Sequence, residues 1–314
     1  MLEVIENGIF TTVQDLGRYG YQRYGVPVSG AVDQFSIRVA NILVGNAEND
    51  AGLEITLVGP TIRFLDNTVI AVTGGQLGPM VDDRPIQCWR SVAVTRGACL
   101  SFSGQQDGMR AYLAVAGGID VPRVLGSRST FIRAKLGGLD GRQLMNGDTL
   151  GVLDTRLSSQ IVGSALMPWN IPTYGNHHIL RVTLGPQDNA FTEKGMRTLL
   201  SSTYTVSSTS DRMGSRLIGP VVEHKKGADI VSDGTSFGAI QITGEGLPII
   251  LLADRGTTGG YTKIANVISV DLARIAQAQI ADTVQFRSVT LSEAHGALRE
   301  QERVIAELRL ATRG

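Results

Sequence analysis

Short apolar segments that end at glycine or proline recur along the 314-residue chain. Each has the length of a strand, is rich in β-branched residues and stops at turn-forming residues, a pattern typical of strands. A Gly-Pro pair follows two of them, residues 53–58 and 179–184, directly. The predicted strands are residues 53–58, 68–73, 111–116, 179–184, 239–243 and 249–253.

Helical periodicity, with apolar residues three and four positions apart, is confined to four places. Gly45 stands where a C-capping glycine would end the first helix, and Thr290 and Glu293 have the spacing of a capping box before the last. The last helix has one apolar and one charged face, so we expect it to pack on the body of the protein or on a partner. The predicted helices are residues 32–43, 190–200, 264–275 and 291–310.

Composition and length extend this pattern to a fold class. Hydrophobic residues make up 42 % of the chain and charged residues 18 %, which is enough for a packed core and excludes disorder. The 38 glycines exceed the usual share of about 7 % and indicate many tight turns. A chain of this length suggests two domains. We expect a mainly β protein with two β-rich lobes (residues 1–156 and 177–290), a linker within 157–176 and a C-terminal helix within 291–314.

Charge and cysteine content exclude several functional classes. The 29 basic and 29 acidic side chains cancel, whereas a nucleic-acid-binding protein usually carries a basic patch. No apolar run approaches the 18 residues of a membrane span, and the acidic N-terminus lacks the basic region of a signal peptide. We therefore expect a cytoplasmic protein without nucleic-acid or membrane partners. Cys88 and Cys99 fit neither a zinc nor a redox spacing, so both are predicted to be buried, reduced thiols.

Several catalytic motifs are absent or misleading. The chain has no Gly-Lys dipeptide, so it has no Walker A loop, and no lysine follows a methionine, as a biotin-carrying lysine would. Residues 234–238 match the G-x-S-x-G motif around Ser236, but a strand is predicted next, which favours a hairpin turn over a catalytic serine. His177 and His178 would point to opposite sides of a strand. We assign them to the surface and predict no metal site.

The most informative polar segment follows the predicted strand 249–253 and precedes the helix predicted from Ile264. Its two threonine hydroxyls and the N–H groups of its two glycines form a potential anion site at a helix N-terminus, to which an arginine adds a bidentate charge. The alternative is a capped helix start with a surface pair of Asp254 and Arg255. The candidate residues are Asp254, Arg255, Thr257, Thr258, Gly259, Gly260 and Tyr261.

Two further polar segments carry candidate residues. Residues 210–216, with Asp211 and Arg212, alternate in charge around a glycine and fit either a functional loop or a solvated turn. The segments 11–18 and 26–33 precede the first predicted helix. Their local pattern favours turns, with Ser29 as the N-cap of that helix. The candidate residues here are Gln14, Asp15 and Ser29.

Together these segments resemble the biotin-dependent carboxyltransferase family, also called allophanate hydrolase subunit 2. The match runs from Met1 to about Phe286. Two positions depart from the family pattern: Gly256 replaces an expected glutamine and Thr262 an expected proline. The motifs that carry the resemblance are residues 11–15, 17–18, 25–27, 29–31, 40–41, 43–46, 53–56, 112–122, 126–130, 147–148, 210–214, 216–217, 232–234, 238–241, 253–255 and 257–261.

The resemblance implies a cyclophilin-like β-barrel fold and the role of the C subunit in an ATP-dependent 5-oxoprolinase. Such complexes also contain the A and B subunits of 5-oxoprolinase, and they hydrolyse the lactam 5-oxo-L-proline to L-glutamate while they consume ATP. The chain would then be inactive alone, carry neither biotin nor metal, and use ATP only through the complex. Two alternatives stay open: a regulatory module that antagonises a kinase inhibitor, and a carboxyltransferase that uses biotin on another polypeptide.

The resemblance also implies where the site lies. The same fold in urea carboxylase places a small amide-like substrate between its lobes. We therefore expect Asp211, Arg212 and Asp254 to be catalytic in such a cleft. The expected substrate- or anion-binding residues are Arg255, Thr257, Thr258, Gly259, Gly260, Tyr261, Gln14, Asp15 and Ser29.

Overall fold

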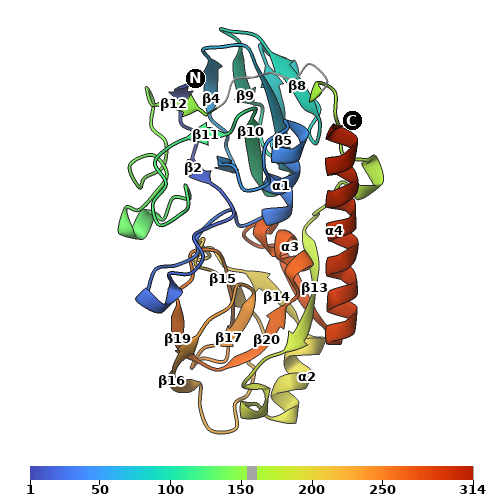
Figure 1. Ribbon diagram of the computed structural model, residues 1–314. Coiled ribbons are helices and arrows are strands. Elements are labelled where there is room, and N and C mark those ends of the chain that lie inside the picture. The colour runs from blue at the N-terminus through green and yellow to red at the C-terminus, as the bar shows by residue number, and fades with distance from the viewer. Residues whose placement is uncertain (154–160, 314) are drawn as a thin grey trace. The chain divides into compact units, whose positions relative to one another are not determined.

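Two compact units make up the chain in a computed structural model that describes residues 1–153 and 161–313 (Figure 1). Unit 1 consists of Met1–Arg18, Ser29–Thr173 and Glu302–Gly314, and unit 2 of Tyr19–Val28 and Tyr174–Gln301. The expected boundaries differ from this division in three ways. Residues 161–173 of the expected linker belong to unit 1, where Leu166 is buried in the core. Residues 19–28 belong to unit 2, and the C-terminal helix is divided between the units. Part of the expected linker, residues 157–160, lies outside the described residues.

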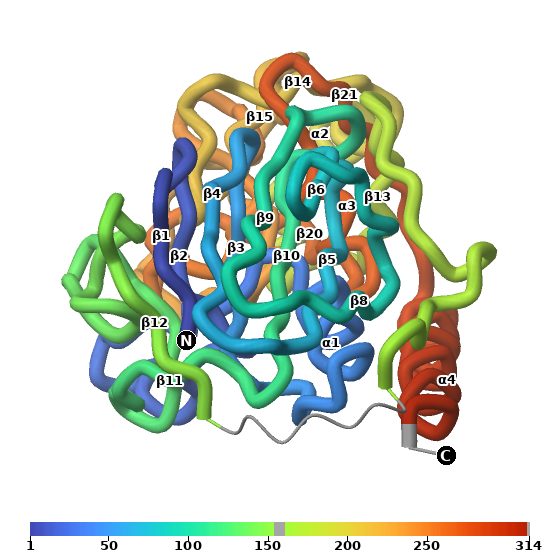
Figure 2. Tube along the Cα trace, turned by 90° about the horizontal axis from the view of Figure 1, so that it is seen from above, coloured from blue at the N-terminus to red at the C-terminus, as the bar shows by residue number. Residues whose placement is uncertain are grey.

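The described part of unit 1 is built from two sheets, one complete helix and the end of the C-terminal helix. Figure 2 shows β1, β4, β9 and β6 side by side, in the order of the seven-stranded sheet β11-β12-β1-β4-β9-β6-β7. The five-stranded sheet has the order β2-β3-β10-β5-β8, and α1 packs on β5 and β10. The bounds are β1 Leu2–Glu6, β2 Phe10–Gln14, α1 Gln34–Leu43, β3 Gly52–Thr56, β4 Thr61–Phe64, β5 Thr68–Gln76, β6 Pro79–Val81, β7 Arg84–Pro85, β8 Ser91–Val94, β9 Cys99–Phe102, β10 Asp107–Val115, β11 Ile119–Asp120 and β12 Thr149–Val152.

Unit 2 is a closed barrel of seven strands, in the order β13-β20-β17-β18-β15-β14-β21. The barrel closes by parallel pairing of β13 with β21, whereas its other pairs are antiparallel. A separate two-stranded ribbon joins β16 and β19. The bounds are β13 His177–Leu184, α2 Glu193–Ser201, β14 Thr203–Val206, β15 Gly214–Ile218, β16 Asp229–Gly234, β17 Ala239–Ile242, β18 Pro248–Leu251, β19 Thr258–Tyr261, β20 Lys263–Val267, α3 Leu272–Gln277, β21 Thr283–Ser288 and α4 Leu291–Arg313.

The mainly β fold with few helices and a C-terminal helix is confirmed, as are the six predicted strands and three of the four predicted helices. Gly45, with φ of 77°, follows α1 and donates its N–H to Ile42 O at 3.0 Å. Thr290 and Glu293 form the capping box of α4, with Thr290 N to Glu293 Oε2 at 2.7 Å and the return bond at 3.2 Å. Within unit 1, Ile305 and Leu308 of α4 are buried in the core.

The helix predicted over residues 264–275 is wrong in its first half. Residues 263–267 form β20 inside the barrel, and helix α3 begins only at Leu272. Apolar residues at Ile264, Val267 and Ile268 fit a helical stripe, but the barrel buries them in an extended strand and the turn after it. Pairing with β13 and β17 satisfies their backbone, so tertiary context outweighs the local periodicity.

Asp33, rather than the predicted Ser29, is the N-cap of α1. Its side chain accepts the N–H of Ser36 at 3.0 Å and the Ser36 hydroxyl at 2.6 Å. The cap belongs to a buried polar network, in which the Tyr112 hydroxyl accepts the Asp33 N–H at 2.9 Å and donates to Glu54 Oε2 at 2.8 Å. The same Glu54 oxygen accepts the N–H of Val32 at 2.9 Å. These bonds tie the start of α1 to strands β3 and β10.

The thiols and histidines differ partly from their predicted places. Cys88 is buried as predicted, but Cys99 is half-buried, and both are free thiols. His177 and His178 do point to opposite sides of β13. Only His177 is exposed, whereas His178 is fully buried and its Nε2 lies 3.0 Å from Asp282 Oδ2. The assignment of both histidines to the surface is therefore wrong for His178.

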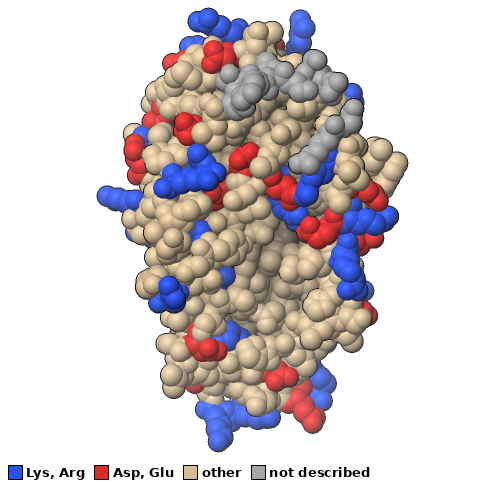
Figure 3. All heavy atoms as spheres, in the orientation of Figure 1, with Lys and Arg blue, Asp and Glu red and all other residues tan. Residues whose placement is uncertain are grey.

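On the face shown in Figure 3, basic and acidic side chains are interspersed rather than gathered into a patch of one sign. Among the described helices, none is long and apolar enough to cross a membrane.

Candidate functional site

A pocket within unit 2, which we call the Lys263 pocket, has a volume of about 550 Å³. Its walls come from the β16–β19 ribbon, strand β20, the turn after β13 and a 3₁₀ turn at Gln22–Tyr24. The predicted anion-binding residues Thr257 and Thr258 are among those that line it. The full lining is Gln22, Arg23, Pro186, Asp233, Gly234, Thr235, Ser236, Thr257, Thr258, Lys263 and Asn266.

An ion pair between Lys263 and Asp233 forms one wall of this pocket. Lys263 Nζ donates to Asp233 Oδ2 at 2.7 Å, and the two side chains are 4 % and 57 % exposed. The hydrogen bond from Lys263 lowers the pKa of Asp233, and the N–H of Gly234, which reaches Asp233 Oδ1 at 2.7 Å, lowers it further. The carboxylate is therefore ionised at neutral pH, and the pocket has a buried cation whose counter-ion faces solvent.

The threonines are held by main-chain bonds. Thr235 N donates to Thr257 O at 3.1 Å, and the Thr235 hydroxyl donates to Gly256 O. Thr258 pairs with Gly234 in the β16–β19 ribbon. In the described part of the chain, the hydroxyls of Thr257 and Thr258 have no hydrogen-bond partner, so both are available to a ligand in the pocket.

The prediction of a helix N-terminus at this loop is wrong. Residues 258–261 form strand β19, and strand β20 follows, so no helix dipole supports an anion here. Gly259 lies against Gln241, since a Cβ atom there would lie 2.5 Å from Gln241 Nε2 and the glutamine side chain would have to move. That nitrogen donates to Tyr261 O at 3.3 Å. Gly260 is half-buried in the same strand. Gly259, Gly260 and Tyr261 therefore build the ribbon rather than line the pocket.

Arg255 is a buried residue rather than half of a surface pair with Asp254. Its guanidinium lies over the Phe237 ring, 5.7 Å from the ring centroid, and donates to Leu252 O at 3.3 Å and Thr235 O at 3.5 Å. Burial lowers the pKa of Arg255. These contacts hold the loop between β18 and β19 in place.

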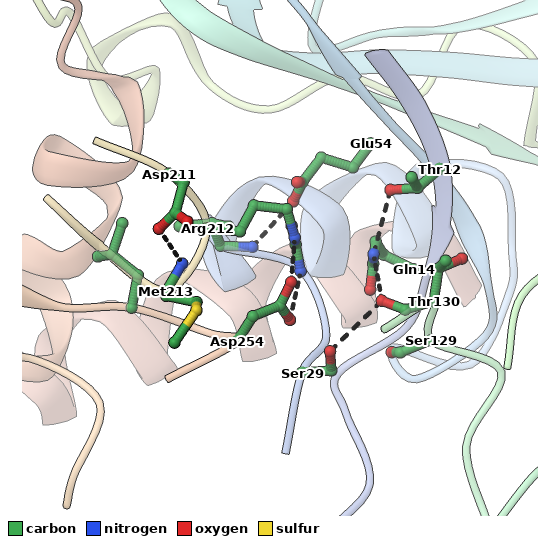
Figure 4. A network of polar contacts seen from close by, with 12 residues as sticks. Thr12, Gln14, Ser29, Glu54, Ser129, Thr130, Asp211, Arg212, Met213 and Asp254 are labelled. Atoms are coloured by element: carbon green, nitrogen blue, oxygen red, sulfur yellow. Dashed lines mark hydrogen bonds and ion pairs between the residues drawn. The ribbon is translucent and has the colours of Figure 1, made fainter. Parts of the chain in front are cut away.

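Arg212 and Asp254, both predicted to be catalytic, form a bidentate ion pair (Figure 4). Arg212 Nε lies 2.9 Å from Asp254 Oδ2, and Nη2 lies 3.3 Å from Oδ1. The side chains are only 10 % and 9 % exposed. The third predicted catalytic residue, Asp211, accepts the N–H of Met213 at 2.8 Å and of Gly214 at 3.2 Å, which closes a turn before β15. None of the three lines the Lys263 pocket.

The predicted residues of unit 1 form a buried cluster. Asp15 accepts the Ser127 hydroxyl at 2.7 Å and the Arg128 N–H at 2.6 Å, so its carboxylate anchors a loop. Figure 4 shows Gln14 and Ser29 beside Thr130. Gln14 Nε2 and the Ser29 hydroxyl donate to Thr130 O at 3.1 and 3.3 Å. Gln14 Oε1 is buried without a hydrogen-bond partner among the described residues.

The two departures from the family pattern have different surroundings. Thr262 N donates to Ala228 O at 2.9 Å, and the Thr262 hydroxyl lies 3.0 Å from His224 Nε2. A proline at this position would lack the N–H that makes the first bond. Gly256 lies beside the pocket, and its carbonyl accepts the Thr235 hydroxyl. A glutamine side chain there would start 3.1 Å from Thr258 O.

Sequence reasoning did not identify Lys263, Asp233 and Asn266 as site residues. Lys263 opens the apolar segment that was interpreted as a helix, and Asp233 lies 30 residues away along the chain. The available signal was the composition of residues 263–267, where a single lysine precedes β-branched and small residues that also suit a strand.

The comparisons with known proteins match this chain along nearly its whole length. It is 36 % identical over 309 residues to a protein of Haemophilus influenzae named as the C subunit of 5-oxoprolinase, covering 98 % of both chains. It is 37 % identical to a protein of the same name from Escherichia coli, covering 98 % of this chain and 97 % of that one. The crystal structure of the Kluyveromyces lactis urea amidolyase matches with a TM-score of 0.92 and 35 % identity, over 98 % of this chain and 20 % of that one.

The family model described as the carboxyltransferase domain, subdomain A and B, matches residues 24–288. That range begins in the 3₁₀ turn beside the Lys263 pocket and ends with the last barrel strand, β21. It includes most of both units and every predicted site residue of unit 2. The chain therefore belongs to the carboxyltransferase domain family.

Proposed function

We propose that this chain is the C subunit of an ATP-dependent 5-oxoprolinase. The observation that carries the proposal is the match to two proteins of that name, which covers at least 97 % of the chains on both sides. By contrast, the chain spans only about a fifth of the urea amidolyase chain that it resembles in structure.

In the proposed reaction, water adds to the lactam carbonyl of 5-oxo-L-proline and the ring C–N bond breaks, which gives L-glutamate. ATP hydrolysis drives this step in the assembled complex, in the cytoplasm where ATP is available. Because the chain has no Walker A loop, we assign the nucleotide to a site of another kind or to a partner protein. We further propose that this subunit works without biotin or a metal ion of its own.

Within the chain, we assign the Arg212–Asp254 pair a positioning role. A buried bidentate pair holds both side chains in one geometry, and the turn closed by Asp211 fixes the backbone that carries Arg212. We propose an indirect role in substrate binding for Gln14, Asp15 and Ser29, which brace a loop of unit 1. The A and B subunits of the complex would pair with the edge strands of the open sheets, β2, β7, β8 and β11.

The proposal is tested by co-expression with the A and B subunits, followed by an assay of L-glutamate formed from 5-oxo-L-proline and ATP. We expect glutamate only when all three chains are present, and no activity from this chain alone. The matched control is the same complex with Lys226→Met, an exposed lysine, which should be fully active. Equal activity without this chain, or separate elution of the three chains on size exclusion at micromolar concentration, would contradict the proposal.

A second candidate is carboxyl transfer with biotin on a separate carrier protein. The family name and the match to urea amidolyase favour it. It differs from the first in requiring bicarbonate and a biotinylated partner. Inhibition of the assembled activity by avidin would support carboxyl transfer, whereas full activity in the presence of avidin would leave the hydrolase.

A further inference from the structure

We propose that the Lys263 pocket is a binding site for a small monocarboxylate, with the Lys263 ammonium as the group that receives the ligand carboxylate. The inference deepens the proposed function, on which it rests only for the identity of the ligand. The site itself is argued from the charge, hydrogen-bonding capacity and size of the pocket.

The charged residues of the pocket leave one positive charge. Three of the lining residues are charged: Arg23, Lys263 and Asp233. Arg23 is exposed, and its guanidinium lies over the Tyr24 ring, 4.7 Å from the centroid, rather than on a carboxylate. Two cations share one carboxylate, so a ligand with a single negative charge makes the pocket neutral.

The pocket also offers several hydrogen-bond donors to a ligand. Asp233 already accepts from Lys263 and from the Gly234 N–H, each at 2.7 Å. Thr257 and Thr258 each offer a hydroxyl to the pocket. Asn266 accepts the Ser236 hydroxyl at 2.8 Å through Oδ1, which leaves its amide N–H groups as donors. A ligand that fits this lining is rich in acceptors, as a carboxylate is.

Asp233 is the partner of the ion pair that a ligand can displace. The backbone of Lys263 lies in barrel strand β20, where it pairs with Gln241, and its N–H donates to Gln187 Oε1 at 3.1 Å. Asp233 instead lies near the end of the β16–β19 ribbon, after an irregularity in its register, and is mostly exposed. Loss of Asp233 alone would leave the buried Lys263 ammonium uncompensated, but an incoming carboxylate replaces one negatively charged partner with another. A ligand carboxylate can therefore displace Asp233 and bind Lys263.

The pocket volume selects a ligand of metabolite size. A volume of about 550 Å³ lies within the usual range of about 300–1,000 Å³ for small-molecule sites. A nucleoside triphosphate carries several negative charges, whereas this pocket balances one. Under the proposed function the ligand is 5-oxo-L-proline, a monocarboxylate whose lactam N–H and C=O would face the hydroxyl and amide groups of the pocket.

The test is calorimetric titration of the full chain, which needs no partner proteins. Three probes separate the possible ligands: 5-oxo-L-proline, the uncharged lactam 2-pyrrolidone and inorganic phosphate. We expect binding of 5-oxo-L-proline alone. Lys263→Met should weaken it about 10- to 150-fold, the equivalent of one hydrogen bond to a charged group. Lys226→Met, the matched change at an exposed lysine, should leave it unchanged.

Asp233→Asn provides an independent measurement if Lys263→Met fails to fold. It removes the competing carboxylate, so we expect tighter binding of 5-oxo-L-proline. Unchanged affinity in Lys263→Met, unchanged or weaker affinity in Asp233→Asn, equal binding of 2-pyrrolidone, or preferential binding of phosphate would each overturn the monocarboxylate site. Binding without glutamate formation in the complex would refute the proposed function and leave the site standing, and activity without binding would do the reverse.

Discussion

Tyr112→Phe is expected to destabilise unit 1 strongly, although it removes a single oxygen atom. Tyr112 is fully buried in β10, and burial raises its pKa well above the usual value of 10.0. Its hydroxyl donates to the Glu54 carboxylate at 2.8 Å and accepts the Asp33 N–H at 2.9 Å. The substitution therefore removes one bond to a charged acceptor and the acceptor of one buried N–H.

The size of the effect follows from these two bonds. Loss of a hydrogen bond to a charged group costs about 1.5–3 kcal/mol, and a buried donor that loses its acceptor costs about 1–3 kcal/mol. Together they predict a loss of about 2.5–6 kcal/mol in the free energy of unfolding. With a urea dependence of about 2 kcal/mol per molar, a loss of about 4 kcal/mol lowers the midpoint by about 2 M.

Tryptophan fluorescence during urea unfolding is a suitable assay. The chain has two tryptophans, Trp89 and Trp169, and both lie in unit 1. The control is Tyr204→Phe in unit 2, where burial raises the pKa of the tyrosine to about 12. No hydrogen bond of standard geometry to its hydroxyl forms within the described residues, although the nearby Ser202 side chain lowers that pKa. This control should leave the fluorescence transition in place. A loss below about 1 kcal/mol for Tyr112→Phe would refute the reasoning.

Two further predictions concern titratable groups. The Arg142 guanidinium, which contacts Asp148 at 2.6 and 2.9 Å, holds the pKa of that carboxyl below its usual value. The stability that this ion pair contributes is therefore complete above the pKa of Asp148 in the unfolded chain. It is lost as the pH falls through the lower pKa of the folded chain. We expect Asp148→Asn to lower the free energy of unfolding by about 1–3 kcal/mol at pH 7, measured by urea unfolding. The difference from wild type should vanish as the pH falls below about 4. A constant difference down to about pH 2 would contradict this. Burial raises the pKa of Cys88 to about 11. At about pH 8 a disulfide reagent should therefore react with Cys88 only after unfolding, whereas it should react quickly with Cys99. Rapid reaction of both thiols in the folded chain would refute this.

The strands were predictable because their ends are encoded locally. Alternation and turn residues mark segments such as 53–58, and a capping box marks the start of α4. Residues 264–275 could not be assigned this way, because their apolar spacing suits a helix and a buried strand alike. The deciding factor is the pairing of β20 with β13 and β17, which local sequence does not contain.

The candidate site was predictable only where chemistry is concentrated in one segment. Thr257 and Thr258 were identified because two adjacent hydroxyls follow a buried strand. The cation beside them was missed, because Lys263 reaches Asp233 across two neighbouring elements, β20 and β16. The Arg212–Asp254 pair likewise joins positions 42 residues apart. Contacts of this kind depend on sheet register, which no local motif specifies.

The parallel closure of the barrel has a consequence for biosynthesis. β13 and β21 meet in the register His177 to Thr283, positions that are 106 residues apart. Closing a flexible loop of that length costs about 4 kcal/mol before the strands gain their pairing. The unit 2 barrel therefore cannot form progressively as the chain leaves the ribosome, since its first strand lacks this neighbour until the last strand has been made. During that interval β13 is an unprotected edge, which exposes unit 2 of the nascent chain to wrong strand pairing.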